Sequence, residues 1–249
     1  MKQTKIYIYG KHAVAEALAN APQAVKKVYL SPKQEDQHIR GLIKRTGVPV
    51  TDLGKDNLPG IDSDVTHQGV IGVISLEDLM RPMKTFLANL KVTDDTSVIV
   101  LGEIQDPHNV GAIIRSAAAF GVAGVLIPEH NQAPVTGAVV KVSAGMAFRV
   151  PLVQIGNINQ AVRDLKEAGF VVYGLEGDGN ASSTEEQYDN PTAFLIGNEA
   201  VGLRPKTKEI CDKLLSIPMH PRCESLNAAV SSAIALYSWS AKHPRSVKR

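Results

Sequence analysis

The chain has 249 residues, of which 44% are hydrophobic and 21% charged, and its formal net charge is +2 at pH 7. This length and composition allow a large buried core, which excludes a disordered chain and a scaffold that depends on disulfides. No apolar run is long enough to span a membrane, and Ile6–Tyr9 is too short for the core of a secretory signal. We therefore expect a folded cytoplasmic protein, and the mild charge alone does not indicate a nucleic-acid partner.

The first 75 residues alternate extended and helical patterns. The expected strands are Ile6–Tyr9, Val25–Leu30 and Val70–Ile74, and the expected helices are His12–Asn20 and Gln34–Thr46. This order predicts a small α/β domain over residues 1–76. Residues 77–95 break the pattern and are expected to form a linker.

From residue 96 the pattern becomes strand then helix, repeated along the chain. The expected strands are Val98–Leu101, Gly124–Ile127, Val150–Val153, Val171–Leu175, Ala193–Ile196 and Leu214–Ile217. The expected helices are Val110–Phe120, Val135–Ala144, Ile158–Ala168 and Ala228–Trp239, the last with Ala229, Ile234, Leu236 and Tyr237 as buried candidates. Such alternation predicts a parallel sheet with helical crossovers in a second domain over residues 96–249.

Several common ligand-binding patterns are incomplete in this chain. Gly177-Asp-Gly179 follows a predicted strand but lacks the third glycine of a dinucleotide-binding turn, so an ordinary polar turn is the simpler interpretation. Residues 197–202 lack the lysine of a phosphate loop. The two cysteines, Cys211 and Cys223, have no second thiol pair and are expected to be reduced. Nicotinamide oxidoreductases, kinases and zinc enzymes are therefore disfavoured.

Three other segments place small and amide residues directly after predicted strands, which is where α/β proteins bind ligands. They are residues 101–115, 194–203 and 216–227. In the first segment Asn109 could simply cap a helix, and the same interpretation applies to Asn227 in the third. Each segment alone is therefore ambiguous between a helix start and a site.

Together the three segments resemble the motifs of the SpoU/TrmH family of RNA ribose 2′-O-methyltransferases, within the knotted SPOUT superfamily. The matching residues are Asn109-x-Gly111-x-x-x-Arg115, Gly197-Asn198-Glu199-x-x-Gly202-Leu203, Ile217-Pro218-Met219 and Ser225-Leu226-Asn227. Segments 10–18, 28–30 and 67–70 resemble the small RNA-substrate-binding domain of the ribosomal-RNA members, the 23S rRNA guanosine type. One departure is His220-Pro221, where the family usually has a residue and a glycine, because proline removes a backbone N–H donor.

The resemblance implies a fold, a cofactor and partners. The fold is a small N-terminal α/β domain followed by an α/β-knot domain with a parallel sheet, and periodicity alone could not indicate the trefoil knot. S-adenosyl-L-methionine would lie in the knot and no metal is expected; the implied cofactor-binding residues are Gly197, Ile217, Leu226, Leu175, Gly174 and Met219. The expected partners are RNA, most of all ribosomal RNA, and a second copy of the chain that packs on the final helix, with no membrane.

The resemblance also implies catalytic residues, which are Arg115, Asn109, Glu199, Ser225 and Asn227. A ribose hydroxyl is a weak nucleophile, and a guanidinium stays protonated, so Arg115 is expected to stabilise the attacking oxygen rather than act as a free base. Loss of its proton during the step is the alternative. The other four residues would orient Arg115, the ribose or the donor, and Glu199 would accept a proton if burial raised its pKa.

Three alternative functions are weighed against this one. A transfer-RNA substrate is opposed only by the resemblance of the N-terminal domain. A non-catalytic RNA-binding protein of the same fold is disfavoured because Asn109, Arg115, Glu199 and Asn227 are all present. A nicotinamide oxidoreductase is disfavoured by the incomplete glycine turn at 177–179.

Overall fold

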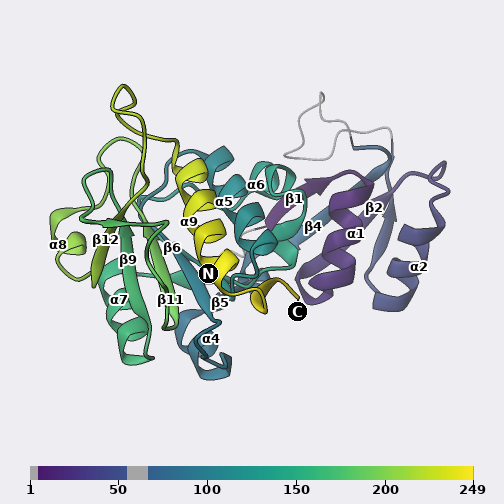
Figure 1. Cartoon of the computed structure of the whole chain (residues 1–249). Coiled ribbons are helices and arrows are strands. Elements are labelled where there is room, and N and C mark those ends of the chain that lie inside the picture. Colours follow the sequence, from purple (N-terminus) through teal and green to yellow (C-terminus); the bar gives the residue numbers. More distant parts are fainter. Residues whose placement is uncertain (1–4, 55–66, 249) are drawn as a thin grey trace.

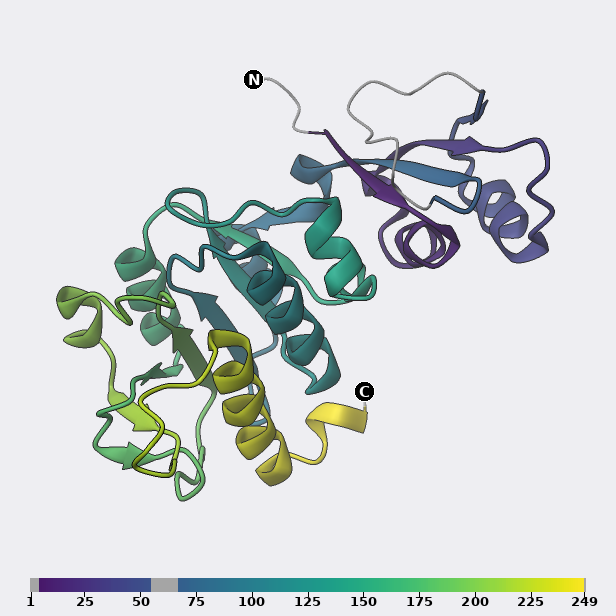
Figure 2. The same ribbon diagram turned by 90° about the horizontal axis from the view of Figure 1, so that it is seen from above.

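The computed structural model describes residues 5–54 and 67–248, which form two lobes (Figure 1). The smaller lobe has a four-stranded sheet in the order β1-β4-β2-β3, and α1 and α2 cover one face of it (Figure 2). Its elements are β1 (Lys5–Tyr9), α1 (Lys11–Asn20), the 3-10 turn η1 (Pro22–Ala24), β2 (Val25–Leu30), α2 (Gln37–Thr46), β3 (Val50–Asp52) and β4 (Val70–Ser75). The central strand β4 is buried at every residue and runs antiparallel to β1 and β2.

Local side chains set the boundaries of α2. The Asp36 carboxylate accepts hydrogen bonds from the backbone N–H groups of His38 and Ile39, which the helix start would otherwise leave free. Gly47 ends the helix in the left-handed conformation at φ 67°. The predicted start at Gln34 is therefore too early, because the helix begins after the Asp36 cap.

The larger lobe has an eight-stranded, all-parallel sheet in the order β10-β12-β9-β11-β6-β7-β8-β5, which confirms the predicted parallel α/β domain. Its first part contains β6 (Ser97–Leu101), α5 (Pro107–Ala119), β7 (Gly124–Pro128), α6 (Gly137–Val142), η2 (Met146–Phe148), β8 (Leu152–Ile155) and α7 (Ile158–Glu167). The remainder contains β9 (Val171–Leu175), β10 (Ala181–Ser182), β11 (Thr192–Ile196), α8 (Pro205–Lys208), β12 (Lys213–Ser216), α9 (Ala228–Lys242) and η3 (Ser246–Lys248). In the described part of the chain no helix is both long and apolar enough to cross a membrane.

The segment expected to be a linker contributes to the larger lobe. It contains α3 (Leu76–Leu79), β5 (Met80–Pro82) and α4 (Met83–Asn89). Strand β5 pairs in parallel with β8 at the edge of the sheet. Phe86 of α4 is 4% exposed and lies in the core under the sheet. These elements have four, three and seven residues, which is too few to show a clear periodicity in the sequence.

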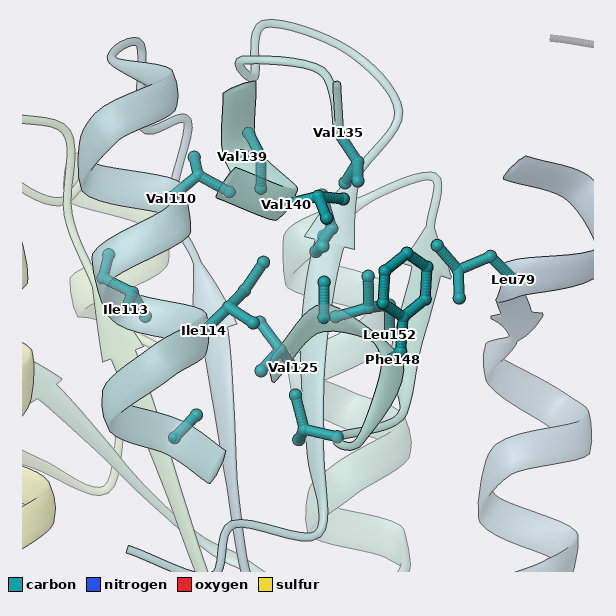
Figure 3. Packing of buried hydrophobic residues seen from close by; sticks show 14 of the residues in the cluster. Leu79, Val110, Ile113, Ile114, Val125, Val135, Val139, Val140, Phe148 and Leu152 are labelled. Carbon is teal, nitrogen blue, oxygen red and sulfur yellow. The ribbon is translucent and has the colours of Figure 1, made fainter. Parts of the chain in front are cut away.

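Helices cover both faces of the larger sheet, with α5, α6 and α9 on one side and α4 and α7 on the other (Figure 2). The residues of β6 alternate between two cores. Ile99 and Leu101 belong to the first core, under α5, α6 and α9, and Val98 and Val100 belong to the second core, under α4 and α7. Successive strand residues point to opposite faces, so a strand covered on both faces is apolar throughout. Figure 3 shows the first core where α5 packs against α6.

Helix α9 is longer than predicted, and one residue predicted to be buried is exposed. Ala229 and Leu236 are buried as predicted, but Tyr237 is 62% exposed, while Trp239 is completely buried. Tyr237 and Leu236 are neighbours about 100° apart around a helix, so the face that buries Leu236 and Trp239 leaves Tyr237 outside. The helix therefore carries an exposed apolar side chain on the molecular surface.

The two lobes contact each other through α6 and η2. A Cβ atom at Gly137 would lie 2.2 Å from the carbonyl oxygen of Tyr7, so only glycine allows α6 to approach β1 this closely. Beside this contact, Arg149 Nε and Nη2 donate to the Glu16 carboxylate at 2.6 and 2.9 Å. The smaller lobe is thus tied to the larger one by backbone packing and a two-point ion pair.

A substitution at Gly111 of α5 measures how tightly α5 packs on α6. A Cβ atom at Gly111 would lie 2.7 Å from Val142 Cβ and 2.9 Å from the Val139 carbonyl oxygen. We expect Gly111→Ala to lower the free energy of unfolding by about 1–3 kcal/mol, because overpacking forces the helices apart. The control is Gly41→Ala on the exposed face of α2, which has no atom within 4 Å and should stabilise by about 0.5–1 kcal/mol. Thermal unfolding measures both, and a stable Gly111→Ala protein would contradict the packing described.

Candidate active site

A cavity of about 520 Å³ lies at the carboxyl ends of the parallel strands of the larger lobe. Strand order reverses there, because the chain runs from β6 toward β7 and β8 on one side and β9, β11 and β12 lie on the other. The residues around it come from three stretches: Leu175, Glu176 and Gly177; Ile196 to Gly202; and Leu215, Ile217, Met219, Glu224 to Ala228 and Ser231. The three segments singled out in the sequence therefore meet near one cavity, although the first of them does not line it.

Two glycines allow the strand ends to approach closely at the cavity. A Cβ atom at Gly102 would lie 2.4 Å from the Ile196 carbonyl oxygen, to which the Gly102 N–H donates at 2.7 Å. A Cβ atom at Gly197 would lie 2.5 Å from the carbonyl carbon of Gly202. Larger residues would push apart the loops that follow β6 and β11.

The side chain of Asn109 connects the three segments. Its Nδ2 donates to Glu199 Oε1 at 2.9 Å, and its Oδ1 accepts from Asn227 Nδ2 at 2.9 Å. The other end of the Asn227 amide caps α9, because its Oδ1 accepts from the backbone N–H groups of Ala229 and Val230. Glu199, Asn109 and Asn227 thus form one polar chain that runs from the cavity wall to the start of α9.

Glu199 is held as a carboxylate. Burial acts to raise its pKa, but hydrogen bonds from the Asn109 side chain and from two backbone N–H groups outweigh that effect, so the pKa lies below its ordinary value. The hydrogen bonds to ionised Glu199 therefore stabilise the folded protein fully above the ordinary pKa of 4.5. This stabilisation is lost as the pH falls through the lowered pKa of Glu199. The condition under which Glu199 would accept a proton, a pKa raised by burial, is therefore not met, because these donors oppose the effect of burial.

The loop of residues 217–227 accommodates its proline without losing a donor. The His220 carbonyl oxygen accepts from the Cys223 N–H at 2.9 Å, and His220 Nδ1 accepts from the Arg222 N–H at 3.2 Å. Pro221 occupies the second position of this turn, where its fixed φ is favourable and no N–H is used. The departure at 220–221 is therefore compatible with an ordered loop.

Most of the site residues predicted from the sequence surround this cavity. Those that line it are Leu175, Gly197, Ile217, Met219 and Leu226 from the cofactor set and Glu199, Ser225 and Asn227 from the catalytic set. Asn109 lies behind the wall, 7% exposed, and contacts it through Glu199 and Asn227. Gly174 does not line the cavity, because it lies within β9 against Leu203 and Leu214.

Arg115 is not brought to the cavity of its own chain. It is exposed on α5, and six helical residues turn it about 120° away from Asn109, so it cannot reach inward beside that residue. Nor does Asn109 cap α5, since Asp106 accepts from the His108 N–H and the helix begins at Pro107. Among residues 5–54 and 67–248, the side chain of Arg115 has no hydrogen-bond or ion-pair partner.

Glu176 is a cavity residue that the sequence interpretation missed. Its Oε1 accepts from the Leu203 N–H at 2.7 Å, and its Oε2 accepts from Lys208 Nζ at 2.8 Å. The available signal was a carboxylate directly after a predicted strand. With Glu199 and Glu224 it makes the lining acidic, and no lysine or arginine belongs to the described lining.

A parallel sheet with a cavity at the point of strand reversal defines the class of α/β proteins that bind a ligand at the strand ends. Two family models then match this chain. The SpoU rRNA Methylase family matches residues 96–237, and the model described as RNA 2'-O ribose methyltransferase substrate binding matches residues 7–79. The chain belongs to the SpoU rRNA methylase family, which confirms the resemblance of its motifs.

Two of the following proteins resemble nearly the whole chain, and a third resembles about two thirds of it. A protein of Xanthomonas axonopodis pv. citri (strain 306), named 23S rRNA (guanosine-2'-O-)-methyltransferase RlmB, is 34% identical over 240 residues, which cover 95% of this chain and 96% of that protein. The SpoU methyltransferase AviRb from Streptomyces viridochromogenes, solved with AdoMet, has a TM-score of 0.82 at 25% identity and covers 96% of this chain and 91% of its own. The TrmH/SpoU tRNA modifying enzyme of A. aeolicus has a TM-score of 0.55 at 26% identity and covers 67% of this chain and 86% of its own.

Substitutions of Asn227 separate its role as a helix cap from its role in the polar chain. Asn227→Asp keeps an oxygen for the N–H groups of α9 but removes the amide that donates to Asn109. We expect Asn227→Asp to keep the cap of α9 but to set an acceptor against Asn109 Oδ1, and to lower methyl-transfer turnover by about 10–100-fold, since Glu199 and Asn109 lose their orientation. Asn227→Ala should also lose about 1 kcal/mol of stability. Wild-type turnover in Asn227→Asp would show that the residue is only a cap.

Proposed function

We propose that this chain transfers a methyl group from S-adenosylmethionine to a ribose 2′-hydroxyl of 23S ribosomal RNA, at a guanosine. The observation that carries the proposal is the acidic cavity at the strand ends, joined to α5 and α9 by the polar chain through Asn109. The Xanthomonas relative named 23S rRNA (guanosine-2'-O-)-methyltransferase RlmB aligns over 95% of this chain, so the similarity includes both lobes. A cytoplasmic location follows from the proposed substrate.

The cavity suits S-adenosylmethionine better than a dinucleotide. The cofactor carries a sulfonium and an ammonium group. Of the three glutamates that line the cavity, Glu176 is paired with Lys208, whereas Glu199 and Glu224 have no lysine or arginine partner among the described residues. A dinucleotide pyrophosphate would meet the same carboxylates and be repelled. Leu175, Ile217 and Leu226 offer apolar side chains for an adenine ring, and the volume of about 520 Å³ is typical of a site for a ligand of this size.

The smaller lobe favours ribosomal over transfer RNA as the substrate. Residues 7–79 match a substrate-binding family model, whereas the tRNA modifying enzyme of A. aeolicus covers only 67% of this chain. We assign residues 1–76 to RNA binding and 96–249 to methyl transfer, and residues 77–95 connect them while adding β5 and α4 to the larger lobe. Contacts such as Arg149 with Glu16 would hold the bound RNA in register with the cavity.

The chain path supports a knotted catalytic domain. Strand β12 lies beyond β9 on one side of the sheet, yet α9, which follows it directly, packs against α5. Residues 217–227 must therefore return across the strand ends, where they meet the loop of residues 197–202 around the cavity. Threading of this return through the preceding loop is our proposal, as an exception to the rule against threaded chains.

A second copy of the chain would complete the site. The exposed face of α9 forms an apolar hollow of about 400 Å³ with α5, lined by Ala112, Ala229, Val230, Ala233, Ile234 and Tyr237. Arg115 lies one helical turn from Ala112 on the same side of α5. A symmetric dimer packed on this hollow would cover its apolar side chains and carry Arg115 toward the cavity of the other subunit.

In such a dimer Arg115 would stabilise the reacting oxygen. Bound S-adenosylmethionine supplies an electrophilic methyl group on its sulfonium. The guanidinium of Arg115 stays protonated and would stabilise negative charge that develops on the 2′ oxygen. The lowered pKa of Glu199 favours an orienting role for that carboxylate over that of a proton acceptor.

Ribose-methylation mapping tests the substrate directly. We expect purified protein and S-adenosylmethionine to methylate one guanosine of 23S rRNA from a strain that lacks this gene, and to leave transfer RNA unmodified. The control is Glu199→Gln, which presents an amide to the donors around Glu199 and should reduce modification strongly. If only transfer RNA were modified, ribosomal RNA would be excluded and transfer RNA would be the substrate.

Mixed dimers test whether Arg115 acts in the site of its own chain or in the site of the other subunit. Arg115→Ala should slow single-turnover methylation by about 10²–10³-fold without changing donor affinity, and Arg115→Lys should rescue little. Mixing Arg115→Ala subunits with Glu199→Gln subunits should restore about a quarter of the wild-type activity, because half of the dimers then contain one intact site. If the mixture stays inactive after subunit exchange is verified by mass, Arg115 does not act across the dimer.

A further inference from the structure

Glu103 combines a left-handed backbone with a paired carboxylate beside the loop that follows β11. It lies in the turn between β6 and α5, and its φ is 65°. This conformation is unfavourable for a residue with a side chain and is usually left to glycine. Such strain persists where the surrounding structure enforces it, and it gathers at functional sites. Glu103 has no role in the proposed methyl transfer itself.

Both the backbone and the side chain of Glu103 hold the loop of residues 197–204. The Glu103 carbonyl oxygen accepts hydrogen bonds from Asn198 Nδ2 at 2.8 Å and from Gln105 Nε2 at 3.0 Å. The carboxylate oxygen Oε2 accepts from Arg204 Nε at 3.0 Å and from Nη2 at 2.8 Å. Glu103 therefore contacts the loop near its first and its last residue.

The loop depends on these polar anchors for its position. Residues 197–202 form one wall of the cavity, and Val201 at the tip is 74% exposed, so little apolar packing holds the tip in place. Asn198 Oδ1 accepts from the N–H groups of Ala200 and Val201, so the position of Asn198 sets the path of the tip. A displacement of Asn198 or Arg204 would change the shape of the wall.

We propose that Glu103 is a positioning residue for the cofactor, because it fixes the loop of residues 197–204 through Asn198 and Arg204 in the shape that binds S-adenosylmethionine. The inference rests on the proposed function, since it takes the cavity to be the cofactor site. The strained φ directs the Glu103 carbonyl to Asn198 while its carboxylate reaches Arg204. Glycine at this position would adopt the same backbone without strain but could not hold Arg204.

Glu103→Gly separates this role from a purely structural one. The ligand-free variant should unfold at the wild-type temperature or above it, because glycine removes the backbone strain. Its dissociation constant for S-adenosylhomocysteine, measured by calorimetry, should rise about fivefold, which corresponds to the upper range for a partly exposed ion pair. Limited proteolysis of the ligand-free variant should cut faster near Arg204.

Three further measurements make the test specific. Arg204→Met should raise the dissociation constant as much as Glu103→Gly, and the double variant should raise it no further, because the two side chains act as a pair. Glu16→Gln breaks the ion pair with Arg149 at the contact between the lobes and should leave the constant unchanged. An unchanged constant in Glu103→Gly, or additive losses in the double variant, would overturn the inference. Wild-type protein that fails to bind the probe would instead overturn the proposed function.

Discussion

The carboxamide of Asn109 is fixed at both ends, and the geometry of the site depends on it. Its amide nitrogen donates to Glu199 and its oxygen accepts from Asn227, so a rotated amide would place donor against donor and acceptor against acceptor. Asn109 is 7% exposed, and a buried polar group without a partner is costly. One side chain therefore holds together the start of α5, the loop after β11 and the start of α9. The cavity can keep its shape only while all three stay in place.

Charge divides the larger lobe into two regions with different partners. The cavity is lined by glutamates, which suit a cationic cofactor, whereas Arg115 lies outside it on an exposed helix. An RNA backbone would be repelled by the carboxylates and attracted to the arginine. Donor and acceptor would then approach the reaction centre from different sides, the cofactor from within one chain and the ribose along the dimer surface. The smaller lobe, packed on α6, would hold the RNA at a fixed distance from that centre.

Sequence patterns predicted the elements well where burial alone decides them. Strands Val25–Leu30 and Val171–Leu175 have the predicted boundaries because turn residues flank a short apolar run. Helix caps were less predictable, since Asp106 and Asn109 are both suitable and only the structure shows that Asp106 is used. Strand β5 is too short for a periodic pattern, and its place depends on pairing with β8.

The sequence indicated the motifs of the site but not their arrangement in space. Asn109 bonds Glu199, 90 residues away, and Asn227, 118 residues away, and no periodicity reports contacts over such separations. The motif spacing places Asn109 and Arg115 on one helix, but it does not report that a rotation of about 120° between them leaves Arg115 exposed. The left-handed conformation of Glu103 could not be predicted, since turns of this kind usually carry glycine.

Calorimetry with two ligands shows whether the cavity held by Asn109 is a site for S-adenosylmethionine. We expect S-adenosylmethionine to bind with one molecule per chain and NAD not to bind. We also expect Asn109→Ala to weaken the binding of S-adenosylmethionine, because the polar chain is broken. Tight binding of NAD, or no binding of S-adenosylmethionine to the wild-type protein, would contradict this assignment of the cavity.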